Sequence, residues 1–324
     1  MPQKIEISSK TIIFTVLFLL SLKMIWQIHE LIFSLFIAFI IAGALKPGVD
    51  YLEKRKIPRT LASFLIYLIF ILLIAGTFNI IIPPLAQEIS RLFKNLPYII
   101  KKTFPYAPIN FFTNFFTQNL PGIANQTVDI IRGIFSNIVF VTSTLFFGFY
   151  FILDNHLIEK LLGSFFEDSE VSRIKYIIDR GQKRMAAWFW GEIILMLIIG
   201  IMTYIGLTTI GMKYVLALAV LAGLFEAIPT LGPIASAVPS FLIGFSYSPV
   251  LGVSTIFLNF IIQQLENNLV VPFVMKKVIG LHPVITLIAL IIGGKLAGIL
   301  GVILAVPTTI FIETVLIETQ KGRK

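Results

Sequence analysis

The feature that most constrains this chain is its series of long, uncharged apolar runs. The clearest run, Leu61–Ile82, contains 22 residues and no charged side chain. As an α-helix it would be about 33 Å long, enough to cross the roughly 30 Å hydrocarbon core of a bilayer. Over the whole chain 57% of residues are hydrophobic and 13% are charged, whereas soluble domains carry about 25% charged residues. The sequence therefore predicts an all-α integral membrane protein.

The distribution of basic residues predicts the orientation of this protein in the membrane. The segment Lys46–Thr60 carries five Lys and Arg residues, and the C-terminus ends in a further basic group. Short basic loops lie on the cytoplasmic side of membranes, so we expect both termini to be cytoplasmic. The net charge of +9 is explained by these loops. Because no basic face with interleaved aromatics appears outside these loops, nucleic-acid binding is not expected.

Two regions are amphipathic rather than membrane-spanning. Residues 84–132 carry apolar side chains at helical spacing and an aromatic stripe, Phe111–Phe116, which predicts extracytoplasmic helices at an interface or against protein. Their role could be packing and oligomerisation, or capture of a ligand. Residues 154–190 combine basic and apolar side chains at helical spacing and predict a cytoplasmic amphipathic region.

The C-terminal part contains apolar segments that are too short to cross a bilayer. Val215–Ala227 and Ile234–Phe245 would each be about 20 Å long as helices, and they are separated by Ile228–Pro233. A second pair, Pro283–Ile292 and Leu296–Ile317, meets at Gly293-Gly294-Lys295. Such interrupted pairs predict broken or re-entrant helices, which build the binding sites of many secondary transporters.

Glu226 is the sharpest candidate site residue, because it stands in an apolar half-span just before Pro229, Gly232 and Pro233. A charge in hydrocarbon costs at least about 3 kcal/mol, and prolines free backbone carbonyls, so this sequence is expected only beside a cavity or inside protein. A buried carboxyl group can take up and release a proton near neutral pH. The alternative is that Glu226 caps the backbone break or pairs with a base during folding.

A second candidate is a polar cluster followed by an isolated lysine. The cluster offers donors and acceptors that could coordinate a cation or a polyhydroxylated solute, or it could simply be a solvated helix end. It comprises Gln263, Gln264, Glu266, Asn267 and Asn268. Lys295 could be the partner of Glu226 or Glu266 across a cavity, or the tip of an exposed turn.

The sequence offers little support for enzyme chemistry. It contains no HExxH, GxSxG or P-loop motif, no cysteine, and three histidines without metal-ligand spacing. We therefore expect no metal, no cofactor and no ATP hydrolysis by the usual route. Any transport would have to be driven by a gradient or by a partner.

Three ordered motifs resemble the AI-2E family of transporters, the autoinducer-2 exporter family. They are GLFEAIPTLGPIASAVP, IIQQLENNLVVPFVMKKVIGLHP and GGKLAGILGVILAVP, within residues 180–316. The resemblance implies an inner-membrane protein of about eight transmembrane helices, a homo-oligomer, and export of a small signalling molecule or related solute. Some members of the family are linked to sodium/proton exchange.

By motif position, the resemblance also implies a set of site residues: Glu226, Pro229, Gly232, Pro233, Gln264, Glu266, Asn267, Pro272, Gly280, His282, Pro283 and Pro307. This chain departs from the family pattern at Thr230, where an aromatic is usual, and at Glu192, where Gln is usual. An extra acid at Glu192, near the cytoplasmic end of its span, would favour cation handling.

We therefore interpret the chain as a gradient-driven transporter that moves a small solute, H⁺ or Na⁺ across the bilayer. Residues 1–153 would form an N-terminal scaffold, 154–190 the cytoplasmic region, and 191–324 the translocation core. Two alternatives remain, a cation/proton antiporter and a non-transporting membrane scaffold or regulatory subunit.

Overall fold

The computed structural model describes residues 9–77, 79, 83, 87, 138–154, 156–228, 231–275 and 282–321. All regular structure within these ranges is helical, and they contain no strand. The predicted all-α fold is therefore confirmed. Of the predicted amphipathic segment 84–132, only Gln87 belongs to the described part of the chain, so the Phe111–Phe116 stripe lies outside it.

The described helices fall into an N-terminal and a C-terminal part of the chain. The N-terminal part contains α1 (Ser9–Gln27), α2 (His29–Lys54), a helix over Arg59–Thr77, α5 (Ile138–Leu153) and α6 (Leu157–Leu162). The C-terminal part contains α7 (Asp168–Thr209), α8 (Val215–Glu226), α9 (Leu231–Tyr247), α10 (Pro249–Leu265), a π-helix η1 (Glu266–Val270), α11 (Val271–Val274) and α12 (Pro283–Lys321).

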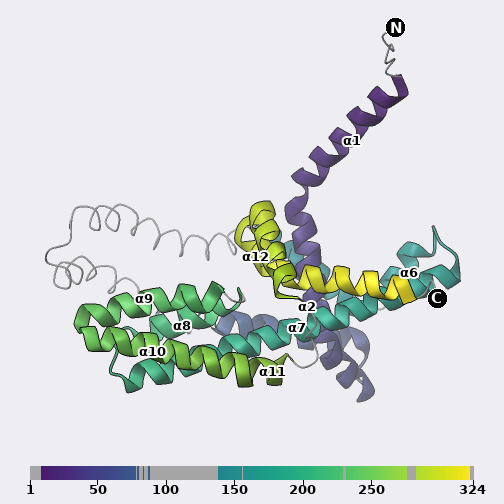
Figure 1. The fold of residues 1–324 in the computed structure, drawn as a ribbon. Coiled ribbons are helices and arrows are strands. Elements are labelled where there is room, and N and C mark those ends of the chain that lie inside the picture. The colour runs from purple at the N-terminus through teal and green to yellow at the C-terminus, as the bar shows by residue number, and fades with distance from the viewer. Residues whose placement is uncertain are drawn as a thin grey trace, which may run out of the picture.

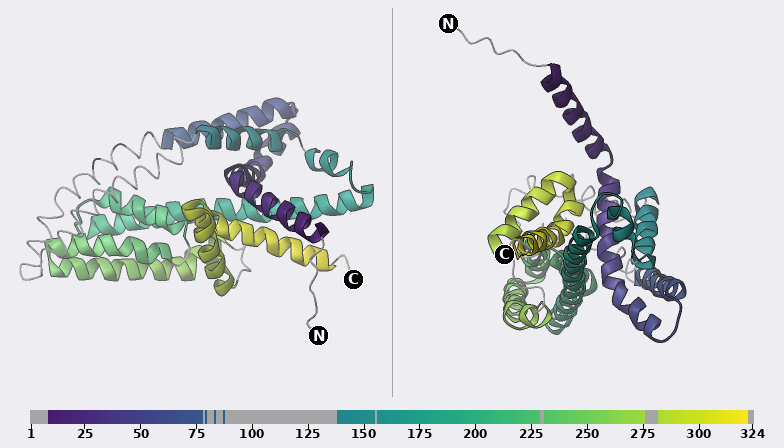
Figure 2. Two further views of the ribbon diagram at one scale, coloured as in Figure 1. Left: turned by 90° about the horizontal axis from the view of Figure 1, so that it is seen from above. Right: turned by 90° about the vertical axis from the view of Figure 1, so that its right-hand side faces the viewer.

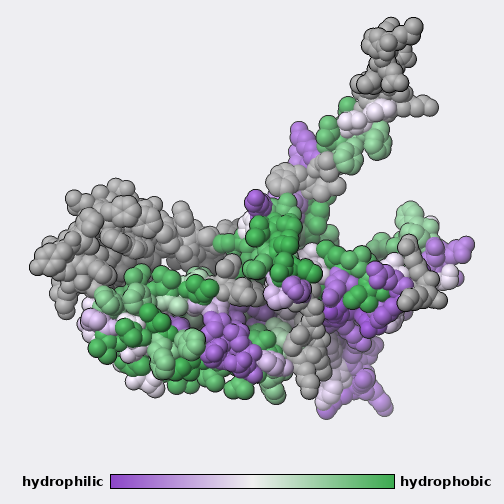
Figure 3. Space-filling model, viewed as in Figure 1, coloured by the Kyte–Doolittle hydropathy of each residue, from purple (hydrophilic) through white to green (hydrophobic). Residues whose placement is uncertain are grey.

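Several of these helices are long and apolar enough to cross a membrane. Within the described ranges they are α2, Arg59–Thr77, α7 and α12, which makes this a multi-pass membrane protein. Shorter apolar helices include α8, whose 12 residues match the predicted half-span. The face formed by α9 and α10 is mainly hydrophobic (Figure 3), as expected for a surface that contacts lipid. The total of about eight spans stays a prediction.

Two helices are longer than the sequence pattern suggested. α2 continues to Lys54 through Pro47, so the predicted loop Lys46–Thr60 is mostly helical. Its last turns are held by Arg59, which pairs with Asp50 and Glu53. α7 runs without interruption through the predicted boundary at 190/191, because no proline or glycine pair breaks the helix there.

α7 is the central helix of the fold and contacts α2, α8 and α12 (Figure 1). Its amphipathic half packs on the last part of α12, where Arg184 pairs with Glu313 at 2.7 Å and donates to the Thr314 hydroxyl at 2.8 Å. On another side, the Gln182 amide donates to the Phe39 carbonyl of α2 at 3.0 Å. A hydrophobic core formed by α2, α7 and α12 lies between these contacts.

Beyond its middle, α7 joins α8, α9 and α10 in a bundle of near-parallel helices (Figure 2). Gly223 of α8 crosses α7 so closely that a Cβ there would lie 2.7 Å from the Met196 carbonyl oxygen. α1 extends away from the other helices in both figures.

α12 consists of two arms that fold back on each other. The break lies at Ala297 and Gly298, whose backbone angles are non-helical, with φ of +56° at Gly298. It follows the predicted break at Gly293-Gly294-Lys295, so that part of the prediction was wrong in position. Gly293 is helical and instead allows close approach, since a Cβ there would lie 2.3 Å from the Gly301 carbonyl oxygen.

Candidate functional site

Three carboxyl groups from different elements are buried together at the end of α8. They are Glu192 of α7, Glu226 at the end of α8 and Glu266 at the start of η1, with relative exposures of 6%, 4% and 5%. The side chains of Glu226 and Glu266 are joined by a hydrogen bond, and Glu192 lies close enough to interact with both charges. Among the described residues, no Lys or Arg forms an ion pair with any of the three.

The turn between α8 and α9 places Glu226 at this site. The chain leaves the α8 geometry after Glu226, and the Gly232 N–H donates to the Ile228 carbonyl at 2.9 Å. A Cβ on Gly232 would lie 2.0 Å from the Phe225 carbonyl oxygen, so only glycine fits. Gly223 lies one turn before Glu226 and brings α8 against α7, which directs the carboxyl group toward Glu192.

The π-helix places Glu266 opposite Glu226. The hydrogen bonds of a π-helix join residues i and i+5, so the side chains of η1 point in other directions than they would in a continued α-helix. Single π-turns of this kind are frequent at functional sites. Glu266 is buried, whereas Gln264, Asn267 and Asn268 on the neighbouring positions are exposed. Next to η1, Gly191 lies so close to Met275 that a Cβ would be 2.7 Å from its sulfur, which holds Glu192 near η1.

The Glu226–Glu266 contact implies a bound proton. Two ionised carboxylates offer only acceptors, so a hydrogen bond between them requires that one carries a proton. Oε2 of Glu226 is buried and has no hydrogen-bond partner among the described residues. The pair is therefore arranged to hold one proton away from water.

A cavity of about 390 Å³ lies on the other side of the α8–α9 turn. One wall comes from that turn and the start of α9, the other from the first arm of α12 before its break. The lining residues are Phe225, Ile228, Gly232, Ala235, Leu290, Ile291, Gly294, Lys295 and Val302. Residues beside both helix breaks thus line one space, and Phe225 in its wall directly precedes Glu226 in the chain.

The structure separates the predicted site residues into three groups. Glu226 and Glu266 meet, as do Gly232 and Lys295 across the cavity, with Pro233 following Gly232 in α9. The members of the predicted polar cluster differ in burial, since Glu266 is buried, Gln263 is half-buried, and Gln264, Asn267 and Asn268 are exposed. Lys295 forms no ion pair with either glutamate. Pro229 lies outside the described residues.

Glu192 is the site residue that sequence reasoning underestimated. Its position near a predicted span end suggested that its charge could reach the membrane surface, but the continuous α7 keeps it buried. The sequence feature that could have predicted the burial of Glu192 is the pair Gly191-Glu192 in an apolar stretch. A small residue lets a neighbouring helix approach closely, and this approach buries the acid beside it.

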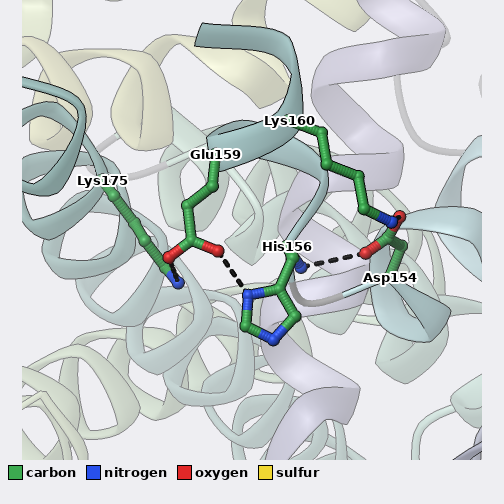
Figure 4. A network of polar contacts seen from close by, with 5 residues as sticks. All are labelled: Asp154, His156, Glu159, Lys160 and Lys175. Carbon is green, nitrogen blue, oxygen red and sulfur yellow. Dashed lines mark hydrogen bonds and ion pairs between the residues drawn. The ribbon is translucent and has the colours of Figure 1, made fainter. Parts of the chain in front are cut away.

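A second polar network lies outside the membrane-spanning helices, between the end of α5 and α7 (Figure 4). Lys160 donates to Asp154 at 2.7 Å, and the His156 backbone N–H donates to the same carboxylate at 3.0 Å. Hydrogen bonds from these two residues hold the pKa of Asp154 below its usual range. Lys175 and then His156 act in the same way on the pKa of Glu159. The network ties α6 to α7.

Comparison with known proteins supports the resemblance seen in the motifs. A model of the family described as AI-2E family transporter matches residues 12–321. YueF of Bacillus subtilis is 33% identical over 306 residues, covering 86% of this chain and 82% of YueF. YrrI of the same organism is 26% identical, covering 96% and 94%, and YhhT of Escherichia coli is 24% identical, covering 90% and 86%. All three are named as candidate transport proteins.

Proposed function

Since this chain belongs to the AI-2E transporter family, we propose that it is a gradient-driven transporter of a small solute, such as a signalling molecule, in the cytoplasmic membrane. The solute would pass through the core formed by residues 191–324, with 1–153 as scaffold and 154–190 as a cytoplasmic region. The observation that carries this proposal is the buried Glu226–Glu266 pair behind a cavity between two helix breaks.

Proton coupling follows from the chemistry of that pair. Two buried carboxyl groups that share one proton carry one negative charge, and no basic side chain in the described part of the chain neutralises it. Loss of the proton would leave two negative charges, so the proton can leave only if water or another cation reaches the site. Movement of the α8–α9 turn would separate Glu226 from Glu266 and expose them. Solute movement in the adjoining cavity and proton release would then be linked through one element, the α8–α9 turn. The names of the relatives, which describe transport, support this direction.

The test is transport in proteoliposomes across an imposed pH gradient, with a panel of small solutes. We expect the wild-type protein to move at least one solute at a rate that depends on the gradient, and Glu226→Gln to lose that dependence. Glu170→Gln is the matched control, because Glu170 is an exposed carboxylate without an ion pair among the described residues. Undiminished gradient dependence in Glu226→Gln would remove Glu226 from the mechanism.

A cation/proton antiporter is the second candidate, and Glu192 is the observation that favours it. A third carboxyl group beside the pair gives the site the excess negative charge that a monovalent cation requires. Sodium efflux from vesicles driven by a pH gradient, without any organic solute, would favour this function. A solute requirement for proton movement would favour the first.

The protein would act as a homo-oligomer in the inner membrane, with both termini cytoplasmic. The rival reading, a non-transporting scaffold or regulatory subunit, predicts that Glu226→Gln and Glu266→Gln leave the cellular phenotype unchanged. In that case, substitutions in the Phe111–Phe116 stripe would abolish it.

A further inference from the structure

The cavity between the two helix breaks contains one formal charge among apolar walls. Lys295 lines it from the first arm of α12, and its neighbours across the space include Phe225, Ile228 and Ala235. No carboxylate among the described residues forms an ion pair with Lys295. Glu226, which follows the wall residue Phe225 in sequence, does not line the cavity and interacts with Glu266 instead. The cavity therefore has a cation without a counter-ion.

The backbone around the cavity adds positive potential and no negative side chain. α9 begins at Leu231, so the positive end of its macrodipole faces this space. The Gly232 N–H is already used by the Ile228 carbonyl, and Pro233 has no N–H. The first turn of α9 therefore offers few donors, and Lys295 is the group positioned to contact an anion directly.

The size and walls of the cavity define the rest of the ligand. Its volume of about 390 Å³ lies within the range of roughly 300–1,000 Å³ that is usual for small-molecule sites. Apolar side chains from α8, α9 and α12 line it, and Phe225 offers an aromatic surface. Lys295 itself is exposed, so a ligand can reach its ammonium group from outside the cavity while its apolar part lies against the walls.

From these observations we propose that the cavity binds a small amphiphilic monoanion, a free carboxylate whose apolar body lies against Phe225 and whose charged group contacts Lys295. This inference rests on the proposed function only in placing the solute between the helix breaks. It concerns binding, which can be measured without transport.

The experiment uses 4-phenylbutyrate as the probe and 4-phenylbutyramide as its neutral match. Calorimetric titration is performed on the full chain in nanodiscs of zwitterionic lipid, with empty nanodiscs subtracted. We expect the carboxylate to bind and the amide to bind at least tenfold more weakly, because the amide lacks the charge-assisted contact. Lys295→Gln should weaken carboxylate binding about tenfold, while Lys295→Arg should retain it.

A second variant tests the cavity without changing charge. Ala235→Phe fills the space from an exposed position on α9, so it should block binding of both probes while the protein remains folded. Equal affinity of carboxylate and amide, or unchanged carboxylate affinity in Lys295→Gln, would overturn the proposal. Loss of probe binding when anionic lipid is added to the nanodiscs would also overturn it, since the site would then belong to lipid headgroups.

The outcome is separable from the coupling mechanism. Glu170→Gln should bind 4-phenylbutyrate with wild-type affinity, because Glu170 is exposed on α7 and does not line the cavity. Binding with no transport of any solute would sustain this inference and contradict the proposed function. Gradient-dependent transport with no carboxylate binding would support the proposed function and contradict this inference.

Discussion

Gly232 is the residue on which the turn between α8 and α9 depends most directly. We expect Gly232→Ala to destabilise the protein by about 1–3 kcal/mol, because the new Cβ would overlap the backbone carbonyl of Phe225, 2.0 Å away. Thermal unfolding in detergent should show a midpoint several degrees lower. Gly76→Ala is the control, since a Cβ there meets nothing within 4 Å. A Gly232→Ala protein that melts with the wild type would show that the turn tolerates a side chain.

At the residue scale, the sequence predicted the identity of the central acids but not how they are arranged. Glu226 and Glu266 each stood out as acids in apolar surroundings. Their meeting depends on the close crossing of α7 and α8 at Gly223 and on the π-turn of η1. Neither contact leaves a local pattern in sequence, and the same packing buries Glu192.

Among the elements, α6 is held mainly by the charge network of Figure 4. The lowered pKa values of Asp154 and Glu159 mean that their stabilising contribution is fully present above the ordinary carboxyl pKa of about 4. It is lost as the pH falls through the lowered values. We therefore expect hydrogen exchange of the α6 amides, corrected for the intrinsic rate, to accelerate on acidification below about pH 4.

Glu159→Gln isolates this contribution. It removes the contacts to Lys175 and His156, so α6 protection should already be reduced at neutral pH, with a smaller further loss on acidification. Glu170→Gln, an exposed carboxylate at the start of α7, should keep the wild-type profile. Identical profiles for Glu159→Gln and the wild type would contradict the role assigned to the network.

The helix breaks show which element boundaries a sequence can predict. The α8–α9 break was predicted from Pro229, Gly232 and Pro233, and the last two lie in the first turn of α9. The α12 break lies later than its glycine pair, since Gly293 allows the second arm to pack closely and Gly298 provides the positive φ. The sequence pattern changes from amphipathic to uniformly apolar at residue 190, which suggested a boundary between two helices. No residue there ends a helix, so α7 continues through it.

For the whole molecule, the orientation in the membrane can be tested directly because the chain has no cysteine. We expect Gln87→Cys to react with a membrane-impermeant maleimide in intact spheroplasts, and Ser164→Cys to react only after permeabilisation. Gln87 follows the span Arg59–Thr77, whereas Ser164 lies beside α6. Both positions are exposed. Labelling of Ser164→Cys in intact spheroplasts would reverse the predicted orientation.

In the whole molecule, the proposed coupling depends on one proton held between Glu226 and Glu266, near the cavity between the two helix breaks. Infrared spectroscopy measures it directly through the carbonyl stretch of a protonated carboxyl group. At neutral pH we predict this band in the wild type and its loss in Glu226→Gln, because the amide of Gln would donate to Glu266 in place of the shared proton. Glu170→Gln should leave the band unchanged. Absence of the band from the wild type, or its persistence at full intensity in Glu226→Gln, would contradict the proposed coupling site.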